Sequence, residues 1–416
     1  MGGVLGGIFN AIVAPLLFTG LTEYPLILVL ACLLRPRAHG VSSAQARWLD
    51  FILPAILAVL LVAVIYDLDP ASSGGKITTS MLMVSCAEGM AGYAFASRPL
   101  RLALGVGAMM VAGMLYSGSQ FKVLHAERSF FGVMQVLADQ GDYYHMFYHG
   151  TTLHGAQSTE PERRREPLTY YLPGGPIGQI FDSFRATETP RTVAIVGLGA
   201  GSLSCYAAYG DQWDFFEIDP AVELIARNPK YFTYYQDCPA RKRVILGDAR
   251  LSLVQIPDNK YGLIIFDAFS SDAVPIHLVN REALQLYLQK LAPGGILVFH
   301  ISNRYLDLKP VLGNLAQDAG LAALIQSREL TEEEENAFYV RTTWVVMARQ
   351  AEDLGFMMHQ EEWEQLPGEP GARLWTDDFS NITRLILWPS FDAPRKLWEK
   401  LSPLSFKPAQ TADESR

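Results

Sequence analysis

The hydrophobic positions form long unbroken runs before about residue 121 and short, regularly spaced ones after it. Residues 51–66 and 102–121 contain no charged side chain, and 77–97 contains only Glu88. A helix of about 20 apolar residues crosses a bilayer core. The pattern therefore predicts three membrane-spanning helices within a transmembrane helical region that covers residues 1–121. Within the first 34 residues, "TEYP" marks a break with a helix on each side of it, unless one of the two is re-entrant.

The next segment, residues 122–190, consists of short β-like stretches with glycine at the turns, among them "YYHMFYHG" and "TTLHGAQ". This pattern predicts a small β domain. We attribute three histidines of this segment, His145, His149 and His154, to the structure of that domain.

From Arg191 the chain alternates between apolar strands and helices. Apolar runs without alternation are typical of parallel strands that are covered on both faces. Strands are expected at 192–196, 213–217, 243–246, 261–266 and 295–301, with a late pair near 321–326 and 340–348, and helices at 201–209, 220–227, 282–291 and 307–319. This predicts an α/β fold with a doubly wound, Rossmann-like sheet over residues 191–395 and a flexible tail at 396–416.

A glycine-rich turn joins the first of these strands to its helix. Gly197, Gly199 and Gly201 allow a tight turn and a close approach of a ligand to the backbone, and the helix start offers free N–H groups. An NAD site would have the spacing GxGxxG, and no GK[ST] follows that would indicate a P-loop. The loop therefore favours a different nucleotide-type ligand.

Acidic side chains stand at the ends of the next three strands. Glu217 ends the second strand, where a carboxylate can accept both hydroxyls of a ribose. Asp248 follows the third strand, where it can meet an adenine amino group, and Asp267 ends the fourth. These positions line one crevice, because open α/β sheets bind ligands at the carboxyl ends of their strands. An S-adenosylmethionine-type cosubstrate fits this pattern best.

The charge of the chain narrows the range of partners. It carries 34 Lys and Arg against 43 Asp and Glu, and the negative excess lies after residue 121. A region this acidic repels phosphate backbones, so nucleic acid is not expected as a partner, whereas a small cationic amine is compatible. The four cysteines show neither a metal-ligand nor a disulfide spacing, and we expect no metal.

Several stretches resemble the spermidine synthase (polyamine aminopropyltransferase) family, and more closely its membrane-fused bacterial members. They include "HGTTLHGAQ", "GLGAGSLSCYA", "FFEIDP", "GDARL", "DAFSSDAVPIHLVNREAL" and "TDDFSN". The resemblance covers roughly residues 120–390 and implies a methyltransferase-type Rossmann-like sheet. It also implies transfer of an aminopropyl group from decarboxylated S-adenosylmethionine to a diamine such as putrescine, and a homodimer formed through the small β domain.

On the cosubstrate side, the resemblance assigns roles to four residues and to the glycine loop. Gln157 would contact the cosubstrate from the β domain, Glu217 would bind its ribose and Asp248 its adenine. Asp267 would take a proton from the attacking amine, because a carboxylate beside the amine can accept it. An alternative role for Asp267 is to orient the cosubstrate without transferring a proton.

The amine side departs from the family pattern. Tyr170 matches the family's tyrosine, but Tyr171 follows it where the family has histidine. The next acid after Asp267 is Asp272, five positions on, whereas the family reads Asp-x-x-Asp. His300 stands near a position where relatives tend to have glutamine. The residues assigned to amine binding are Tyr170, Asp272, His300 and Asp377, the last of which could equally cap a helix.

These departures leave two alternatives open. One is an enzyme that acts on intact S-adenosylmethionine by methyl transfer, cyclisation or lyase chemistry. The other is a non-catalytic sensor in which adenosyl binding controls the membrane helices.

The orientation in the membrane has two conflicting indications. Loops 35–49 and 98–101 carry five arginines, which by the positive-inside rule places them in the cytoplasm and the C-terminal domain outside. An adenosyl cosubstrate favours the opposite. We expect a multi-pass protein of the bacterial inner membrane, in contact with the lipid bilayer, with its catalytic domain in the cytoplasm.

Overall fold

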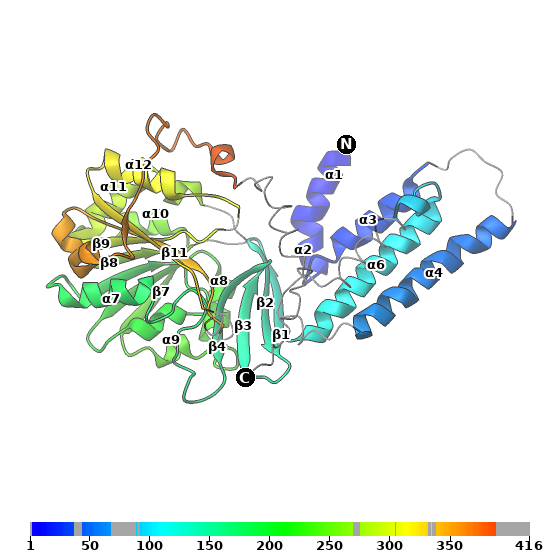
Figure 1. The fold of residues 1–416 in the computed structure, drawn as a ribbon, viewed down its shortest axis with the longest axis horizontal. Coiled ribbons are helices and arrows are strands. Elements are labelled where there is room, and N and C mark those ends of the chain that lie inside the picture. Colours follow the sequence, from blue (N-terminus) through cyan, green and yellow to red (C-terminus); the bar gives the residue numbers. More distant parts are fainter. Residues whose placement is uncertain are drawn as a thin grey trace, which may run out of the picture.

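The protein combines a helical N-terminal third, a small antiparallel sheet and a larger α/β part. The computed structural model describes residues 2–36, 44–67, 89, 92–268, 275–303, 305–331, 334 and 338–387. Figure 1 shows the small sheet between the N-terminal helices on one side and the large sheet with its helices on the other.

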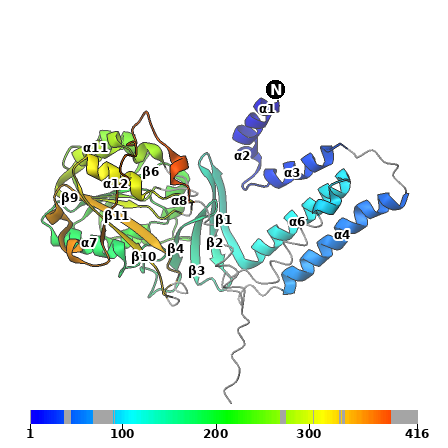
Figure 2. The ribbon, with the colours of Figure 1, turned by 45° about the horizontal axis from the view of Figure 1, so that its top comes forward.

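The N-terminal third forms helices of very different length. They are α1 (Gly2–Ile8), η1 (Phe9–Val13), α2 (Ala14–Leu17), α3 (Glu23–Leu34), α4 (Ala44–Asp67) and α6 (Pro99–Gln120). Helices α4 and α6 lie side by side (Figure 2) and share a small apolar core that includes Leu57, Phe95 and Ala112. Asp50 of α4 pairs with Arg101 of α6 at 2.8 Å, which joins the two helices at one end.

The prediction of membrane-spanning helices is wrong for the described part of the chain. Among these residues, no helix combines the length and the apolar character that a bilayer crossing requires. Helix α3 has only 12 residues, and the charge-free stretch 51–66 of α4 is shorter than the about 20 residues that span a bilayer core. The expected span 77–97 lies mostly outside the described residues. The predicted transmembrane region and multi-pass membrane location are therefore corrected.

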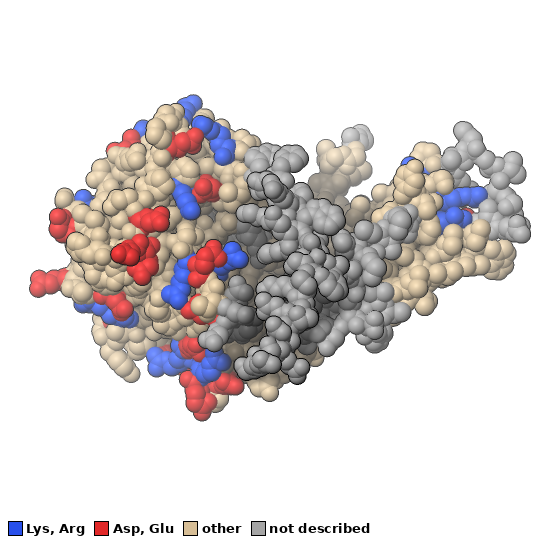
Figure 3. Space-filling model, viewed as in Figure 1, with Lys and Arg blue, Asp and Glu red and all other residues tan. Residues whose placement is uncertain are grey.

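The surface of these helices nevertheless differs from that of the α/β part. In Figure 3, Lys, Arg, Asp and Glu are scattered over the α/β part, whereas the visible helices are almost entirely free of them. Large apolar side chains are exposed there, among them Leu16, Val59 and Val111.

The small sheet is antiparallel and follows chain order. Its strands are β1 (Phe121–Ser129), β2 (Gly132–Asp139), β3 (Tyr144–His149) and β4 (Thr152–Ser158). Met134, Val136 and Phe147 belong to the same buried cluster as residues of the large sheet. Strand β4 lies directly on the glycine loop, because a Cβ atom on Gly155 would come within 2.6 Å of the Ala200 Cβ. The two sheets therefore form one packed unit.

The large sheet has eight strands in the spatial order β12-β10-β11-β9-β8-β5-β6-β7. Strands β7, β6, β5, β8 and β9 are parallel to one another, and β11, β10 and β12 continue the sheet in antiparallel pairs. The bounds are β5 (Thr192–Val196), β6 (Gln212–Glu217), β7 (Arg241–Leu246), β8 (Tyr261–Phe266), β9 (Leu291–His300), β10 (Ala322–Arg328), β11 (Thr342–Ala348) and β12 (Glu364–Gln365). This order confirms the predicted Rossmann-like, methyltransferase-type sheet.

Both faces of the large sheet are buried. Val193 and Ile195 of β5 pack into one core with α7 (Pro176–Ala186), α8 (Pro220–Arg227) and η5 (Ala351–His359). Ala194 and Val196 pack into the other, with α10 (Ala249–Val254), α11 (Arg281–Lys290) and α12 (Lys309–Asp318). The shorter segments are η3 (Ser202–Tyr206), α9 (Tyr234–Asp237), η4 (Ile276–Leu278) and η6 (Ile382–Leu385). Strand order reverses between β5 and β8, which is where sheets of this type form a ligand crevice.

Candidate active site

The glycine loop turns the chain sharply after β5. Gly197 has φ 102° and Gly201 has φ 85°, which side chains with a Cβ rarely adopt. A Cβ on Gly197 would lie 2.2 Å from the carbonyl oxygen of Asp267. Only glycine therefore allows β5 and the end of β8 to approach so closely.

A cavity of about 220 Å³ opens beside this loop, at the carboxyl ends of the parallel strands. We call it the glycine-loop cavity. Its lining brings together Gly197, Gly199, Glu217, Asp248 and Asp267. Gly201 is not part of the lining and shapes the turn, where its N–H donates to the carbonyl of Leu198.

Glu217 is buried in the wall of the glycine-loop cavity. Its two carboxyl oxygens accept the N–H groups of Asp219 at 2.9 Å and Leu198 at 3.0 Å. Burial raises the pKa of Glu217 to about 7, although these backbone donors favour the ionised form. The group therefore changes its charge near neutral pH.

Asp248 stands at the start of α10. One oxygen accepts the Leu251 N–H at 2.9 Å and caps the helix, and the other contacts His277 Nε2 at 2.9 Å. The side chain faces the cavity with both oxygens already engaged by the protein.

Asp267 is held by two side chains. Tyr171 donates its hydroxyl to Oδ2 at 2.7 Å, and His300 Nδ1 lies 2.7 Å from Oδ1. Burial alone would raise the pKa of Asp267, but His300 and the hydrogen bonds from both partners outweigh it and hold the pKa below its usual range. Burial also raises the pKa of Tyr171 well above its usual value, which keeps the hydroxyl a donor.

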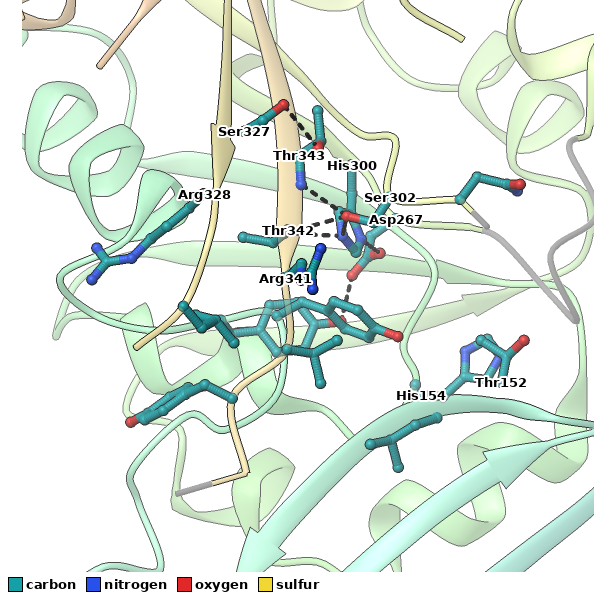
Figure 4. Close-up of a pocket in the computed structure, with 18 of the residues that line it drawn as sticks. Thr152, His154, Asp267, His300, Ser302, Ser327, Arg328, Arg341, Thr342 and Thr343 are labelled. Carbon is teal, nitrogen blue, oxygen red and sulfur yellow. Dashed lines mark hydrogen bonds and ion pairs between the residues drawn. The ribbon is translucent and has the colours of Figure 1, made fainter. Parts of the chain in front are cut away.

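The hydrogen-bond chain continues beyond His300. Its Nε2 atom meets Ser302 Oγ at 2.7 Å and Thr342 Oγ1 at 3.3 Å, and its ring stacks on Trp344 at 4.4 Å between centroids. Figure 4 shows the run from Asp267 through His300 to Ser302, with Thr342 beside it. The imidazole therefore has one fixed orientation toward the carboxylate.

A second cavity of about 580 Å³ also has Asp267 in its wall. We call it the His300 cavity, because Tyr170, Tyr171, His300 and Ser302 form part of its wall. Its charged lining residues include Arg328 and Arg341, which pair with Glu334 at 2.7 Å and with Glu329 at 3.1 Å. Among the residues that the structure describes, three line both cavities: His154, Gly199 and Asp267. The two spaces therefore meet at Asp267.

Comparisons with known proteins show which proteins this chain is similar to. No family model matches the chain. A stretch of 115 residues is 39% identical to a polyamine aminopropyltransferase of Vibrio vulnificus, over 26% of this chain and 37% of that protein. The chain is similar to the polyamine aminopropyltransferases. The resemblance inferred from the motifs is thus confirmed, and the similarity supports the predicted transferase class. The match spans little more than a third of the length of the curated relative.

Solved structures include similar chains. A probable spermidine synthase from Corynebacterium glutamicum has a TM-score of 0.42 at 16% identity, over 55% of this chain and 79% of that one. Spermidine synthase from Thermotoga maritima has a TM-score of 0.39 at 14% identity, over 60% and 81%.

Two residues that the family resemblance assigns to the binding site lie outside both cavities. Gln157 lines neither cavity, and its amide is used by the protein, with hydrogen bonds to the Arg164 carbonyl and to Thr233. Asp377 also lines neither cavity and forms a bidentate pair with Arg250 at 2.5 and 2.8 Å. Gln157 joins the small sheet to the α/β part, and Asp377 fixes the start of α10. Asp272 lies outside the described residues.

Two other residues reach the site without having been assigned to it. Tyr171, which replaces the family's histidine, donates to Asp267, while the neighbouring Tyr170 lies 5.0 Å from the His300 ring. His154, attributed above to the β domain, lines both cavities. The stretch "HGTTLHGAQ" was the available signal for His154, but its sequence does not say which histidine faces a ligand.

Proposed function

We propose that this protein is an aminopropyltransferase of the spermidine synthase type, which transfers an aminopropyl group from decarboxylated S-adenosylmethionine to a diamine such as putrescine. The position of Asp267 carries the proposal, because this carboxylate lines both cavities. Ligands bound on its two sides would meet there, as a transfer between two substrates requires.

The glycine-loop cavity suits the adenosyl cosubstrate. Its carboxylates at Glu217, Asp248 and Asp267 give it a negative lining that favours a sulfonium cation. In this proposal Glu217 accepts the ribose hydroxyls and Asp248 meets the adenine. The positive φ values at Gly197 and Gly199 let the backbone approach the ligand without a clash.

The reaction needs alignment more than acid or metal chemistry. The lone pair of the amine attacks the carbon next to the sulfonium, the carbon–sulfur bond breaks, and its electrons leave a neutral thioether, methylthioadenosine. The amine nitrogen then loses one proton, which Asp267 accepts directly or through water. Tyr171 and His300 keep that carboxylate in place through the hydrogen bonds described above.

The His300 cavity would receive the amine. Its volume of about 580 Å³ leaves room for a linear diamine, and its arginines are paired with glutamates. Tyr170 offers an aromatic wall to the methylene chain. The roles of Asp272 in amine binding and of the small sheet in a homodimer stay predictions.

Product analysis tests the proposal. The purified protein is incubated with either decarboxylated or intact S-adenosylmethionine, each with and without putrescine, and the products are identified by mass spectrometry. We expect spermidine and methylthioadenosine only from the decarboxylated cosubstrate with amine. Methylthioadenosine from the intact cosubstrate without amine would replace the proposal by lyase chemistry, and binding without turnover would replace it by a sensor.

A further inference from the structure

Two side chains from different sheets meet at the junction of the cavities. Of the three described residues that line both, Gly199 has no side chain, and the other two are Asp267 at the end of β8 and His154 on β4. Figure 4 shows His154 on the small sheet and Asp267 on the large one. The backbone of His154 is fixed against the glycine loop, since a Cβ on Gly199 would lie 2.8 Å from its carbonyl oxygen.

The imidazole of His154 has unused hydrogen-bonding capacity. Its Nε2 atom is buried and has no hydrogen-bond partner within the described part of the chain, although the residue as a whole is partly exposed. Leaving a buried polar atom unpaired is unfavourable, because the atom has lost its hydrogen bonds to water. Because His154 also lines both cavities, its unpaired nitrogen is available to a donor group on a ligand.

His154 is a neutral group at physiological pH. Burial, together with a smaller contribution from the neighbouring His149, lowers its pKa to about 4, and Asp267 opposes the shift. A neutral imidazole offers one acceptor and one donor nitrogen. It can hold a ligand N–H without competing with Asp267 for the proton.

We infer that His154 contacts the attacking primary amine and, together with Asp267, aims its lone pair at the cosubstrate. The inference rests on the proposed function. A neutral primary amine has two N–H groups and one lone pair. If Asp267 accepts one N–H and His154 Nε2 accepts the other, the lone pair is the only feature left to point toward the glycine-loop cavity. Asp267 retains capacity for this, because a carboxylate has about four acceptor sites and two are occupied.

The charge at the junction selects the same class of ligand. His154 is neutral there, and Asp267 is ionised because its pKa lies below the usual range. A ligand carboxylate placed there would be repelled by Asp267, whereas an N–H donor satisfies both groups. The junction therefore fits an amine.

Variants of His154 test whether its Nε2 atom accepts an N–H group of the amine. His154→Leu removes the acceptor, and His154→Gln retains one near the Nε2 position. His125→Leu is the matched control, since His125 is another histidine of the small sheet and lines neither cavity. Each variant is assayed with putrescine and N-methylputrescine, with the transfer to the methylated nitrogen quantified separately, and methylthioadenosine affinity is measured by calorimetry.

We expect His154→Leu to lower kcat/KM for primary amines about 5- to 150-fold, the equivalent of one lost hydrogen bond. Its methylthioadenosine affinity should stay within about threefold of wild type. A methylated nitrogen has only one N–H, whereas a primary nitrogen has two. The Leu variant should therefore lose most of the wild-type preference for attack by the primary nitrogen. The Gln variant should recover part of the kcat/KM and part of the preference for the primary nitrogen. His125→Leu should match wild type in both quantities.

The outcomes separate this inference from the function on which it rests. If the wild-type protein transfers nothing to any amine, the proposed function fails. If it transfers normally and His154→Leu keeps both its kcat/KM and its preference, the role of His154 is overturned. If the Leu variant loses methylthioadenosine binding, the rates of His154→Gln and His154→Asn are compared instead to test the role of His154. The inference requires Gln, whose amide reaches the Nε2 position, to exceed Asn, and equal rates contradict it.

Discussion

Asp267 Oδ1 and His300 Nδ1 lie 2.7 Å apart, and the opposite nitrogen of the same imidazole meets the hydroxyls of Ser302 and Thr342. Because the carboxylate accepts, Nδ1 carries the hydrogen and Nε2 faces the hydroxyl groups. The histidine thus fixes the orientation of Asp267 and favours its ionised form at the meeting point of the two cavities.

Replacement of Asp267 tests its role in proton transfer. Asp267→Asn should lower kcat about 10²- to 10⁴-fold, the range of a lost general base, while methylthioadenosine binding is retained. Asp182→Asn, on the exposed side of α7, serves as a control and should not change either quantity. Normal turnover by Asp267→Asn would show that this carboxylate is not the base.

Loss of His300 should change the pH dependence of the reaction. His300 lowers the pKa of Asp267, and without it burial raises that pKa. Activity needs the ionised carboxylate, so it falls as the pH drops through this pKa. We expect His300→Gln to move the acidic limb of kcat/KM to higher pH. An acidic limb that stays in place would mean that His300 supports the fold only.

The glycine loop offers a test of close packing. Gly197→Ala would place a Cβ 2.2 Å from the Asp267 carbonyl at φ 102°, so the loop must move and methylthioadenosine binding should be lost. Gly210 also has a positive φ, 95°, but nothing lies within 4 Å of its Cβ position. Gly210→Ala should therefore cost only about 1–2 kcal/mol of conformational strain and leave binding intact. Equal losses in both variants, measured by calorimetry, would contradict this account.

Glu217 should make cosubstrate affinity pH-dependent. Its pKa of about 7 lies above that of a free carboxyl group, so the empty site holds a proton below pH 7. If the ionised form accepts the ribose hydroxyls, binding releases that proton and methylthioadenosine affinity falls up to about tenfold per pH unit below 7. Above pH 7 it should level off. Glu217→Gln should bind weakly and without this slope, and an unchanged slope would assign it to another group.

A buried ion pair connects the N-terminal helices to the small sheet. Arg128 of β1 donates to Glu23 at 2.7 Å and to the Gly20 carbonyl at 3.0 Å, and Glu23 is fully buried. Arg128→Leu leaves this carboxylate unpaired, which costs about 3–5 kcal/mol. We expect a lower free energy of unfolding in urea, mostly restored by adding Glu23→Gln. A double variant as unstable as the single one would contradict the ion pair as the cause.

The sheet was predictable because its central strands are short and unbroken apolar runs. Strands β5 and β8 begin and end where the pattern placed them, at 192–196 and 261–266. Strand β9 begins at Leu291, earlier than expected, because Pro293 and two glycines interrupt its apolar pattern. The charge-free runs 51–66 and 102–121 do lie almost entirely within α4 and α6, but hydropathy alone did not show that no helix in the described part of the chain is long and apolar enough to cross a bilayer.

The acids of the site could be located from the sequence because they directly follow parallel strands. Glu217, Asp248 and Asp267 reach one cavity for that reason alone. The partners of Asp267 could not be found in this way. Its hydrogen-bond donor Tyr171 is 96 residues away in sequence. His154, which lines both cavities together with Asp267, belongs to the other sheet. Gln157 lines neither cavity, because its amide forms hydrogen bonds with Thr233 and with the Arg164 carbonyl.

Transfer of a labelled aminopropyl group measures the central claim most directly. Decarboxylated S-adenosylmethionine deuterated in its aminopropyl chain is incubated with unlabelled putrescine and the full chain, and spermidine and methylthioadenosine are quantified by mass spectrometry. The account predicts deuterated spermidine and methylthioadenosine in equal amounts, and formation of both slowed about 10²- to 10⁴-fold in Asp267→Asn. Methylthioadenosine without deuterated spermidine, or no product from the wild-type protein that binds methylthioadenosine, would contradict it.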